Sequence, residues 1–402
     1  MTISTLSFQM SAVGQMDTLS QALSKTQTEL STGLALQNAA DNPVAMAQVN
    51  ALNVQLSASQ QYVTNGNLAG TNLKLEAQAL TDATNLLQST RDLALQANNS
   101  TLNASDRQAL ATQLEQQLQQ LVGIANRQDS EGNYLFSGYA AGTKPFAQSG
   151  NSVSYSGASG VDQIQINLEQ SISAGDTGSS VFMNTPAGNG SFTTAASTGN
   201  TGTASIGPGT VTDPSQWASA SGTYSISFSS ATQYTITNTA TGTVVTSGTL
   251  SGASGATNTI AFNGIQLTLS GSPNSGDSFT VAPAGTASVF STLQGLISTL
   301  NSTTLNAAQI ATQLSQGLEQ IDGALNHLGT VQASVGARIN ATSAAQTAAQ
   351  STQTDLQMTI SQLSNVDYAQ ATTQLSTEEL ALQAAQESYA SIEKLSLFNY
   401  VS

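Results

Sequence analysis

The last stretch of the chain, residues 372–402, reads TTQLSTEELALQAAQESYASIEKLSLFNYVS. Its larger side chains recur at a seven-residue spacing, at Leu375, Leu382 and Tyr389, and again at Ala385 and Ile392. This spacing gives a helix one narrow apolar stripe, which leaves water only when it faces another helix. The stretch therefore predicts a coiled-coil helix whose partner lies elsewhere in the chain.

The N-terminal residues offer that partner, because residues 2–32 predict a helix that ends at Gly33, a residue suited to a left-handed cap. Its apolar side chains follow steps of three and four: Ile3, Leu6, Met10, Val13, Met16, Leu19, Leu23 and Leu30. We expect the two ends of the chain to pair as antiparallel helices. The predicted assembly seam consists of Leu6, Met10, Val13, Leu375, Leu382, Ala385, Tyr389, Ile392 and Leu395.

Further helices are predicted on either side of the middle of the chain. Asn42 and Pro43 suit the cap and first turn of a helix that runs to about residue 98, roughly 80 Å at 1.5 Å per residue. Ser105 and Gln108 match a capping box at the start of the next helix. Beyond Pro283 the chain contains no proline, and its apolar periodicity predicts helices again.

The segment from 151 to 285 has a different composition, rich in Ser, Thr and Gly with short alternating apolar runs. Asn263-Gly264 between Phe262 and Ile265 is a type I′ hairpin signal. Residues 184–216 contain few apolar residues and are compatible with a loop or a linker. The segment predicts an all-β insert, a small sandwich or barrel.

These patterns predict an α+β fold, in which a long antiparallel α-helical coiled-coil rod made from both chain ends carries an inserted all-β domain. Three parts are expected: a terminal coiled-coil assembly domain (1–40 with 361–402), an α-helical rod (41–150 with 286–360) and a surface-exposed β insert (151–285).

Composition excludes several classes of function. The net charge is −15, from 23 acidic and 8 basic residues, which disfavours binding to nucleic acid or to an anionic membrane surface. There is no cysteine, no apolar run long enough to span a membrane and no secretory signal pattern. We therefore expect neither nucleic acid nor membrane as a partner.

The residues needed for catalysis are also missing. His327 is the single histidine, so the many serines lack a base and no histidine–cysteine metal set can form. Glu378 and Glu379 are adjacent and point to different faces of a helix, so they cannot act as a carboxylate pair. We expect no enzymatic activity, no cofactor and no metal site. Trp217 is expected in the core of the insert.

Both helical arms carry motifs that resemble the bacterial flagellar axial proteins, the flagellin-like family. The N-terminal motifs are Leu30-Ser31-Thr32-Gly33, Asp41-Asn42-Pro43-Val44-Ala45, Gln61-Tyr62, Asp106-Arg107, Ala125-Asn126 and Gly132-Asn133-Tyr134-Leu135-Phe136-Ser137-Gly138 with Pro145-Phe146. The C-terminal motifs are Val335-Gly336-Ala337-Arg338-Ile339, Asp367-Tyr368-Ala369 and Leu395-Ser396-Leu397-Phe398-Asn399-Tyr400. Together they cover about two thirds of the chain. The 132–138 segment favours the hook–filament junction branch over flagellin.

The resemblance implies a structural subunit that joins hook to filament, in a ring of identical subunits between the first hook-associated protein and flagellin. It also implies an extracellular location in the flagellum, reached by flagellar type III export without a cleaved signal peptide. An export chaperone is expected on the C-terminal helix. Two alternatives remain: another axial protein, either flagellin or the first hook-associated protein, and a secreted coiled-coil adhesin.

Overall fold

The computed structural model describes residues 2–99, 102–220, 222–251 and 256–401, with side chains from residue 7 to residue 391 within these ranges. The chain forms two compact units. The first contains residues up to 64 and from 346 onward, and the second contains residues 65–345. Helices α2 (Pro43–Ala97) and α6 (Ala307–Ser364) contribute residues to both units.

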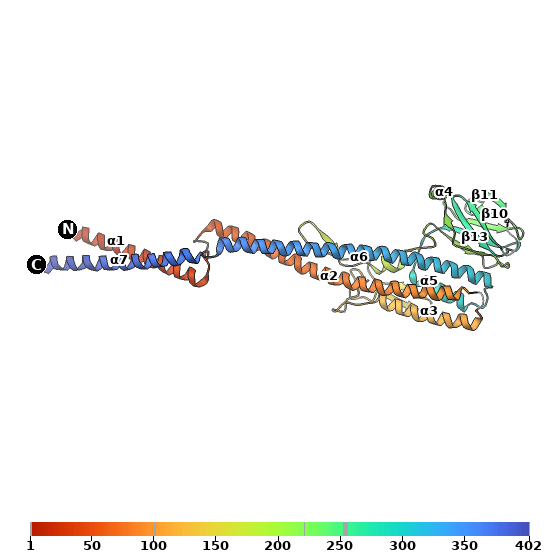
Figure 1. Cartoon of the computed structure of the whole chain (residues 1–402), viewed down its shortest axis with the longest axis horizontal. Helices are drawn as coiled ribbons and strands as arrows, with labels where there is room; N and C mark the ends of the chain where they lie inside the picture. The colour runs from red at the N-terminus through yellow and green to blue at the C-terminus, as the bar shows by residue number, and fades with distance from the viewer. Residues whose placement is uncertain (1, 100–101, 221, 252–255, 402) are drawn as a thin grey trace. The chain divides into compact units, whose positions relative to one another are not determined.

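The first unit is built on α1 (Thr2–Thr32) and α7 (Tyr368–Val401), which lie side by side with the two chain ends together (Figure 1). Gly33 ends α1 with a φ of +75°, and its N–H donates to the Glu29 carbonyl at 2.8 Å. At the start of α2, the Asn42 Oδ1 accepts the Ala45 N–H at 3.0 Å, and Pro43 is the first helical residue. The predicted termini of α1 and α2 are therefore confirmed.

A short antiparallel bridge joins the segment that follows α1 to the segment between α6 and α7. It pairs Leu34 with Asn365, where α6 stops before α7 begins. The Ala35 N–H donates to the Ser364 carbonyl at 2.8 Å, and the Val366 N–H donates to the Gly33 carbonyl at 3.0 Å. These backbone hydrogen bonds fix the direction in which α7 runs back along α1. The predicted antiparallel pairing of the termini is thus confirmed.

The second unit contains a helical bundle of α2, α3 (Ala104–Ala125), α5 (Val289–Asn301) and α6, which share one apolar core (Figure 1). The start of α3 differs from the prediction. Its cap is Asn103, whose side chain accepts the Asp106 N–H at 3.0 Å while Asp106 reaches back to the Asn103 N–H. The capping box predicted at Ser105 is wrong, because Asn103 and Asp106 form the same arrangement two residues earlier.

The segment that follows α3 packs on the bundle. It contains short hairpins and a π-helix: β1 (Phe146–Ser149), β2 (Ser152–Tyr155), β3 (Gln163–Gln165), β4 (Ser171–Ser173) and η1 (Ser179–Met183). The buried rings of Phe146 and Phe182 join Phe136 and Phe290 in the core of the bundle. Residues 151–183, expected in the insert, therefore pack with the helices, because their few aromatic side chains are buried there.

The β insert itself is a two-sheet sandwich around a separate core (Figure 1). One sheet has the order β11-β10-β9-β14-β6, and the other has β12-β13 with β7 and β8 on the free side of β13. The strands are β6 (Phe192–Ala196), β7 (Ser205–Ile206), β8 (Thr210–Val211), β9 (Tyr224–Phe228), β10 (Gln233–Asn238), β11 (Val244–Thr249), β12 (Thr257–Phe262), β13 (Ile265–Ser270) and β14 (Ser278–Pro283). The neck that joins the sandwich to the helices pairs β5 (Thr185–Pro186) with β15 (Thr286–Ala287).

The predicted turn at Asn263-Gly264 is confirmed, because both residues have a positive φ and Phe262 pairs with Ile265. Trp217, in the short helix α4 (Pro214–Ser219), is buried in the sandwich core as predicted. The linker reading of 184–216 is wrong. That segment supplies β5 to β8, which the sequence hides because each strand is short and buries few side chains.

Polar side chains of α6 hold the sandwich. The Gln309 Nε2 donates to the carbonyls of Thr198 and Asn200 at 3.1 and 3.2 Å, and the Gln316 Nε2 donates to the Thr194 carbonyl. The two apolar cores are separate, so the insert folds around its own centre and meets the bundle through amide groups.

Candidate assembly surface

The contact between α1 and α7 is a narrow seam of small and medium side chains. On α7 the buried or half-buried positions include a series with steps of three and four: Ala371, Leu375, Glu378, Leu382, Ala385 and Tyr389. On α1 the corresponding positions are Ala12, Met16, Leu19, Leu23, Thr26 and Leu30. This alternation is the packing expected of two coiled-coil helices. It places the predicted residues Leu375, Leu382, Ala385 and Tyr389 toward α1; their part in assembly stays a prediction.

Met10 and Val13 lie on a different face of α1. Their side chains are 70% and 41% exposed. The intrachain contact expected between these residues and α7 is therefore wrong, because Ala12 and Met16 occupy the seam in their place. The predicted seam residues Leu6, Ile392 and Leu395 lie outside the residues whose side chains the structure describes.

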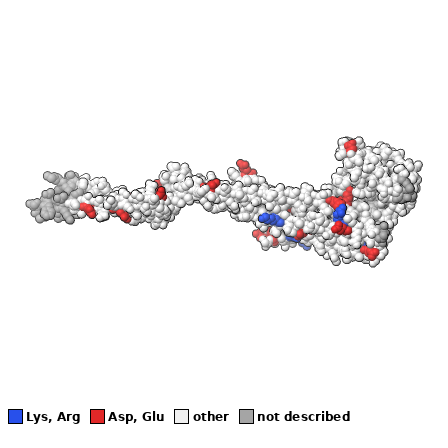
Figure 2. Space-filling model, viewed as in Figure 1, with Lys and Arg blue, Asp and Glu red and all other residues white. Residues whose placement is uncertain are grey.

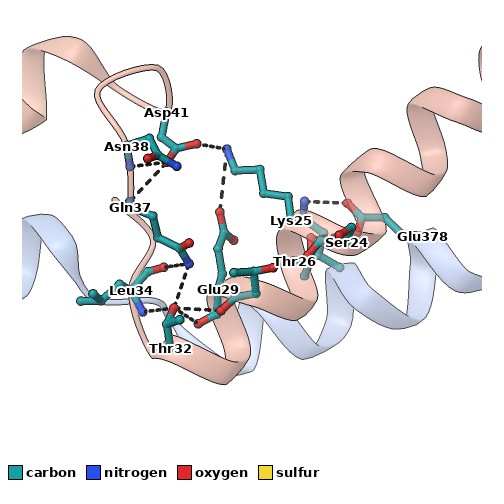
Figure 3. Close-up of polar contacts among 12 residues, drawn as sticks. Ser24, Lys25, Thr26, Glu29, Thr32, Leu34, Gln37, Asn38, Asp41 and Glu378 are labelled. Atoms are coloured by element: carbon teal, nitrogen blue, oxygen red, sulfur yellow. Dashed lines mark hydrogen bonds and ion pairs between the residues drawn. The ribbon is translucent and has the colours of Figure 1, made fainter.

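A polar pair inside the seam fixes the register of the two helices. The hydroxyl of Thr26, 2% exposed, donates to the Glu378 Oε2 at 2.8 Å (Figure 3). The other Glu378 oxygen accepts a hydrogen bond from the Gln374 side chain at 2.9 Å. A carboxylate held on both oxygens in a narrow seam disfavours any slip of one helix along the other.

The loop between α1 and α2 is held by Asp41 (Figure 3). Its Oδ2 accepts the N–H groups of Asn38 and Gln37 at 3.0 and 3.2 Å, and its Oδ1 lies 2.9 Å from the Lys25 Nζ. The hydrogen bond from Lys25, followed by those from the Asn38 and Gln37 backbone, lowers the pKa of Asp41. Asp41 thus stays ionised and ties the loop back onto α1. Sequence reasoning used Asp41 only as part of a motif, since nothing in the local pattern indicates its partner Lys25.

The outward surface of the helical pair carries little charge and several exposed large apolar side chains. Besides Met10 and Val13, exposed large side chains include Phe8 on α1 and Leu380 on α7. Along α1 the charged residues are Asp17, Lys25 and Glu29 only. The face in view in Figure 2 carries scattered acidic side chains on a largely uncharged helical pair. Exposed apolar side chains on a helical pair with little charge favour contact with other protein chains.

The residues that the structure describes contain no group of three or more His, Cys, Asp or Glu side chains arranged to hold a metal ion. None of the helices in the described ranges is both long enough and apolar enough to cross a membrane. His327 is half-buried, with its Nε2 2.8 Å from the Ser180 carbonyl, and so has a packing role beside the π-helix.

Three family models match the chain. The bacterial flagellin N-terminal helical region matches residues 3–141, and the bacterial flagellin C-terminal helical region matches residues 318–401. Residues 195–283 match the D2-like domain of flagellar hook-associated protein 1. The two terminal matches cover both helices of the seam, and the third covers most of the sandwich.

Solved structures extend the likeness over most of the chain. The flagellar hook-associated protein-3 of Legionella pneumophila superposes with a TM-score of 0.72 at 30% identity, over 78% of this chain and 98% of that protein. FlgL of Xanthomonas campestris gives a TM-score of 0.69 at 31% identity, over 76% of this chain and 98% of that one. The chain belongs to the hook-associated protein 3 family.

The resemblance inferred from the motifs is thereby confirmed. The flagellar hook-associated protein 3 of Escherichia coli K12 is 31% identical over 154 residues, which is 38% of this chain and 48% of the relative. The match therefore spans about half the length of that relative. Within the hook-associated protein 3 family, this chain combines the paired terminal helices with a sandwich of the hook-associated protein 1 type.

Proposed function

We propose that this protein is a structural subunit of the bacterial flagellum that joins the hook to the filament. The observation that carries the proposal is the antiparallel α1–α7 pair, which keeps Met10 and Val13 on its outward face in a protein of this family. Within the part of the chain that the structure describes, α1 and α7 contact mainly each other, which leaves that face exposed. Neighbouring subunits are its natural cover.

The partners follow from this position. Identical copies form a ring. The first hook-associated protein lies on one side of this ring, and flagellin lies on the other. The chain reaches this place by type III export, and a chaperone covers the C-terminal helix before export. The apolar stripes support this proposal, because a helical pair this narrow is marginal in water until it is packed against other chains. The resulting location is the extracellular flagellum, and the role is structural rather than enzymatic.

Deletion of the protein tests the proposal directly. A deletion strain is expected to keep its hooks and to release flagellin into the medium, because filament subunits lack the ring on which they polymerise. The measurement is immunoblotting of flagellin in the medium together with electron microscopy of the hooks. Re-expression of the full chain is expected to restore attached filaments and motility.

Other outcomes favour the alternatives. Loss of the filament subunit itself indicates a flagellin. Hooks that no longer retain the next junction protein indicate the first hook-associated protein, the class to which the sandwich is similar.

An adhesin is tested by removing the sandwich alone. Ala187 and Gly285 are joined by a backbone hydrogen bond of 3.0 Å, so a short turn between them replaces residues 188–284 without disturbing the bundle. Normal motility with loss of host binding then favours the adhesin.

A further inference from the structure

Glu76 of α2 is a buried carboxyl group without an opposite charge of its own. Its side chain is 1% exposed, and neither carboxylate oxygen has a hydrogen-bond partner among the described residues. The group faces the 174–176 backbone, since a methyl group on Gly175 would lie 3.5 Å from the Glu76 Oε2. An ionised carboxylate in this position is unfavourable, because it loses its water and no hydrogen bond replaces it.

Among the described residues, the cation that acts on Glu76 is Arg338, which makes no hydrogen bond to it although the Arg338 Nε has no other partner. Arg338 of α6 binds the Asp176 carboxylate through its Nη2, and its Nη1 donates to the Gly175 carbonyl at 3.1 Å. The same guanidinium reaches the Ser173 carbonyl at 3.5 Å. Arg338 therefore holds the 173–176 backbone and the Asp176 side chain against α6, and leaves Glu76 facing a second carboxylate.

The other titratable groups around Glu76 are also acids or a phenol. The cleft beside it is lined by Asp129, Glu131 and Tyr134 from the loop after α3 and by Asp162 from the segment before β3. The cleft lining, taken over the described residues, includes no lysine, arginine or histidine. The cleft lining therefore offers no positive charge that would compensate a charge on Glu76.

Protonation of Glu76 removes the repulsion between the two facing carboxylates, Glu76 and Asp176. The Asp176 carboxylate acts directly on Glu76, yet two ionised carboxylates cannot donate a hydrogen bond to one another. A protonated Glu76 becomes the donor, and Asp176 accepts from it while still paired with Arg338. Burial, with the Asp176 carboxylate next in size, raises the pKa of Glu76 to about 9, against the opposing effect of Arg338.

We propose that Glu76 holds a proton in the folded protein and donates it in a hydrogen bond to Asp176, so that this one proton locks the segment 161–178 onto α2 and α6. Loss of the proton at alkaline pH releases the segment. Glu76, Asp176 and Arg338 thus form a proton-dependent clasp between the two long helices.

The direction of the pH dependence follows from the two states of Glu76. In the locked state the proton stays bound up to a pH of about 9, whereas in the released state Glu76 returns to its ordinary pKa of 4.5. Release therefore frees one proton, and its equilibrium constant rises tenfold per pH unit between these two values. The segment 161–178 is therefore held most firmly at the acid end of this pH window, near 4.5, and is released at the alkaline end, near 9.

Two measurements on the full chain test the clasp. The carboxyl ¹³C resonance of Glu76 is expected to titrate with a midpoint near 9. Hydrogen-exchange protection factors, which already correct for intrinsic rates, are expected to fall tenfold per pH unit for the amides of 161–178 between pH 6 and 9. In Glu76→Gln, whose amide donates to Asp176 at any pH, protection is expected to be independent of pH. The exposed Glu115→Gln, on α3 and outside the cleft lining, is the matched control and is expected to keep the wild-type slope.

A Glu76 resonance that titrates below pH 6, or an unchanged slope in Glu76→Gln, overturns the proposal. So does a Ca²⁺ titration at pH 7 that shifts the Glu76 resonance and stabilises the wild type but not Glu76→Gln. In that case a cation rather than a proton neutralises the site.

Discussion

Leu382→Asp is expected to remove the protein from the junction while the second unit stays folded. Leu382 is half-buried on the α7 face that packs on α1, about one turn from the Thr26–Glu378 pair that sets the register. A carboxylate at this position loses the apolar contact of Leu382, and the described seam residues offer it no cation, which costs about 2–4 kcal/mol. The α1–α7 pair is only marginally stable, so a loss of this size in pairing free energy is expected to separate the two helices. The measurements are the helical circular dichroism of the purified chain and its recovery in sheared hook–filament preparations.

A second substitution separates pairing within the chain from docking between chains. Met10→Asp changes a side chain that is exposed in the isolated chain, so the helical pair is expected to form as in the wild type. Incorporation is nevertheless expected to fail, because the charge lies on the surface proposed to meet neighbouring subunits. Leu168→Asp, at a side chain 78% exposed in the β3–β4 turn, is the control and is expected to assemble normally. For the first substitution, normal filament attachment by Leu382→Asp would contradict the proposed role of the α1–α7 pair in assembly.

Phe182→Ala is expected to destabilise the bundle of the second unit by about 3–5 kcal/mol. Phe182 is fully buried in the π-helix η1, and its ring lies 5.2 Å from Phe136, 5.8 Å from Phe146 and 5.9 Å from Phe290 between ring centres. Removal of this ring leaves a cavity at the point where the hairpin segment meets α5. Denaturant unfolding followed by helical circular dichroism measures the loss.

The lone tryptophan supplies an internal control for that experiment. Trp217 lies in the separate core of the sandwich, so its fluorescence reports that core alone. The midpoint measured by fluorescence is expected to stay near the wild-type value while the helical midpoint falls. A loss below 1 kcal/mol in the helical transition would show that the four rings are not the centre of the bundle.

The helices and hairpins were predictable because their signals are local. Gly33 and Pro43 mark the ends of α1 and α2 through backbone geometry alone. Asn263 and Gly264 both adopt the positive φ that a two-residue hairpin requires. Such features depend on neighbours within a few residues, so a single sequence is enough to find them.

The face of α1 that meets α7 was not predictable from the larger side chains. Steps of three and four fit Met10 and Val13 as well as Ala12 and Met16, and size favoured the wrong pair. In the seam, small residues such as Ala12 and Thr26 alternate with larger ones such as Met16, so side-chain size alone does not mark the face that meets α7. Only the position of α7 distinguishes the two faces.

Contacts between distant segments account for the remaining errors. Glu76 stands in a helix whose polar positions are mostly exposed, and its burial comes from the backbone around Gly175, about a hundred residues later. Phe146 and Phe182 lie in a stretch rich in Ser and Gly, yet their rings belong to the helical core. A composition boundary near residue 149 therefore marked a change of local structure, not the edge of a packing unit.

The pairing of the two chain ends is tested most directly by one disulfide in assembled flagella. The chain has no cysteine, so Thr26→Cys with Glu378→Cys introduces a single pair at positions whose side chains are in hydrogen-bonding contact. Oxidation is expected to link the two positions within one chain. The control pair, Thr26→Cys with Tyr389→Cys, is about 16 Å out of register along α7 and is expected to stay reduced. Crosslinks found only between different subunits, or formed equally by the control pair, would contradict the antiparallel pairing of the termini.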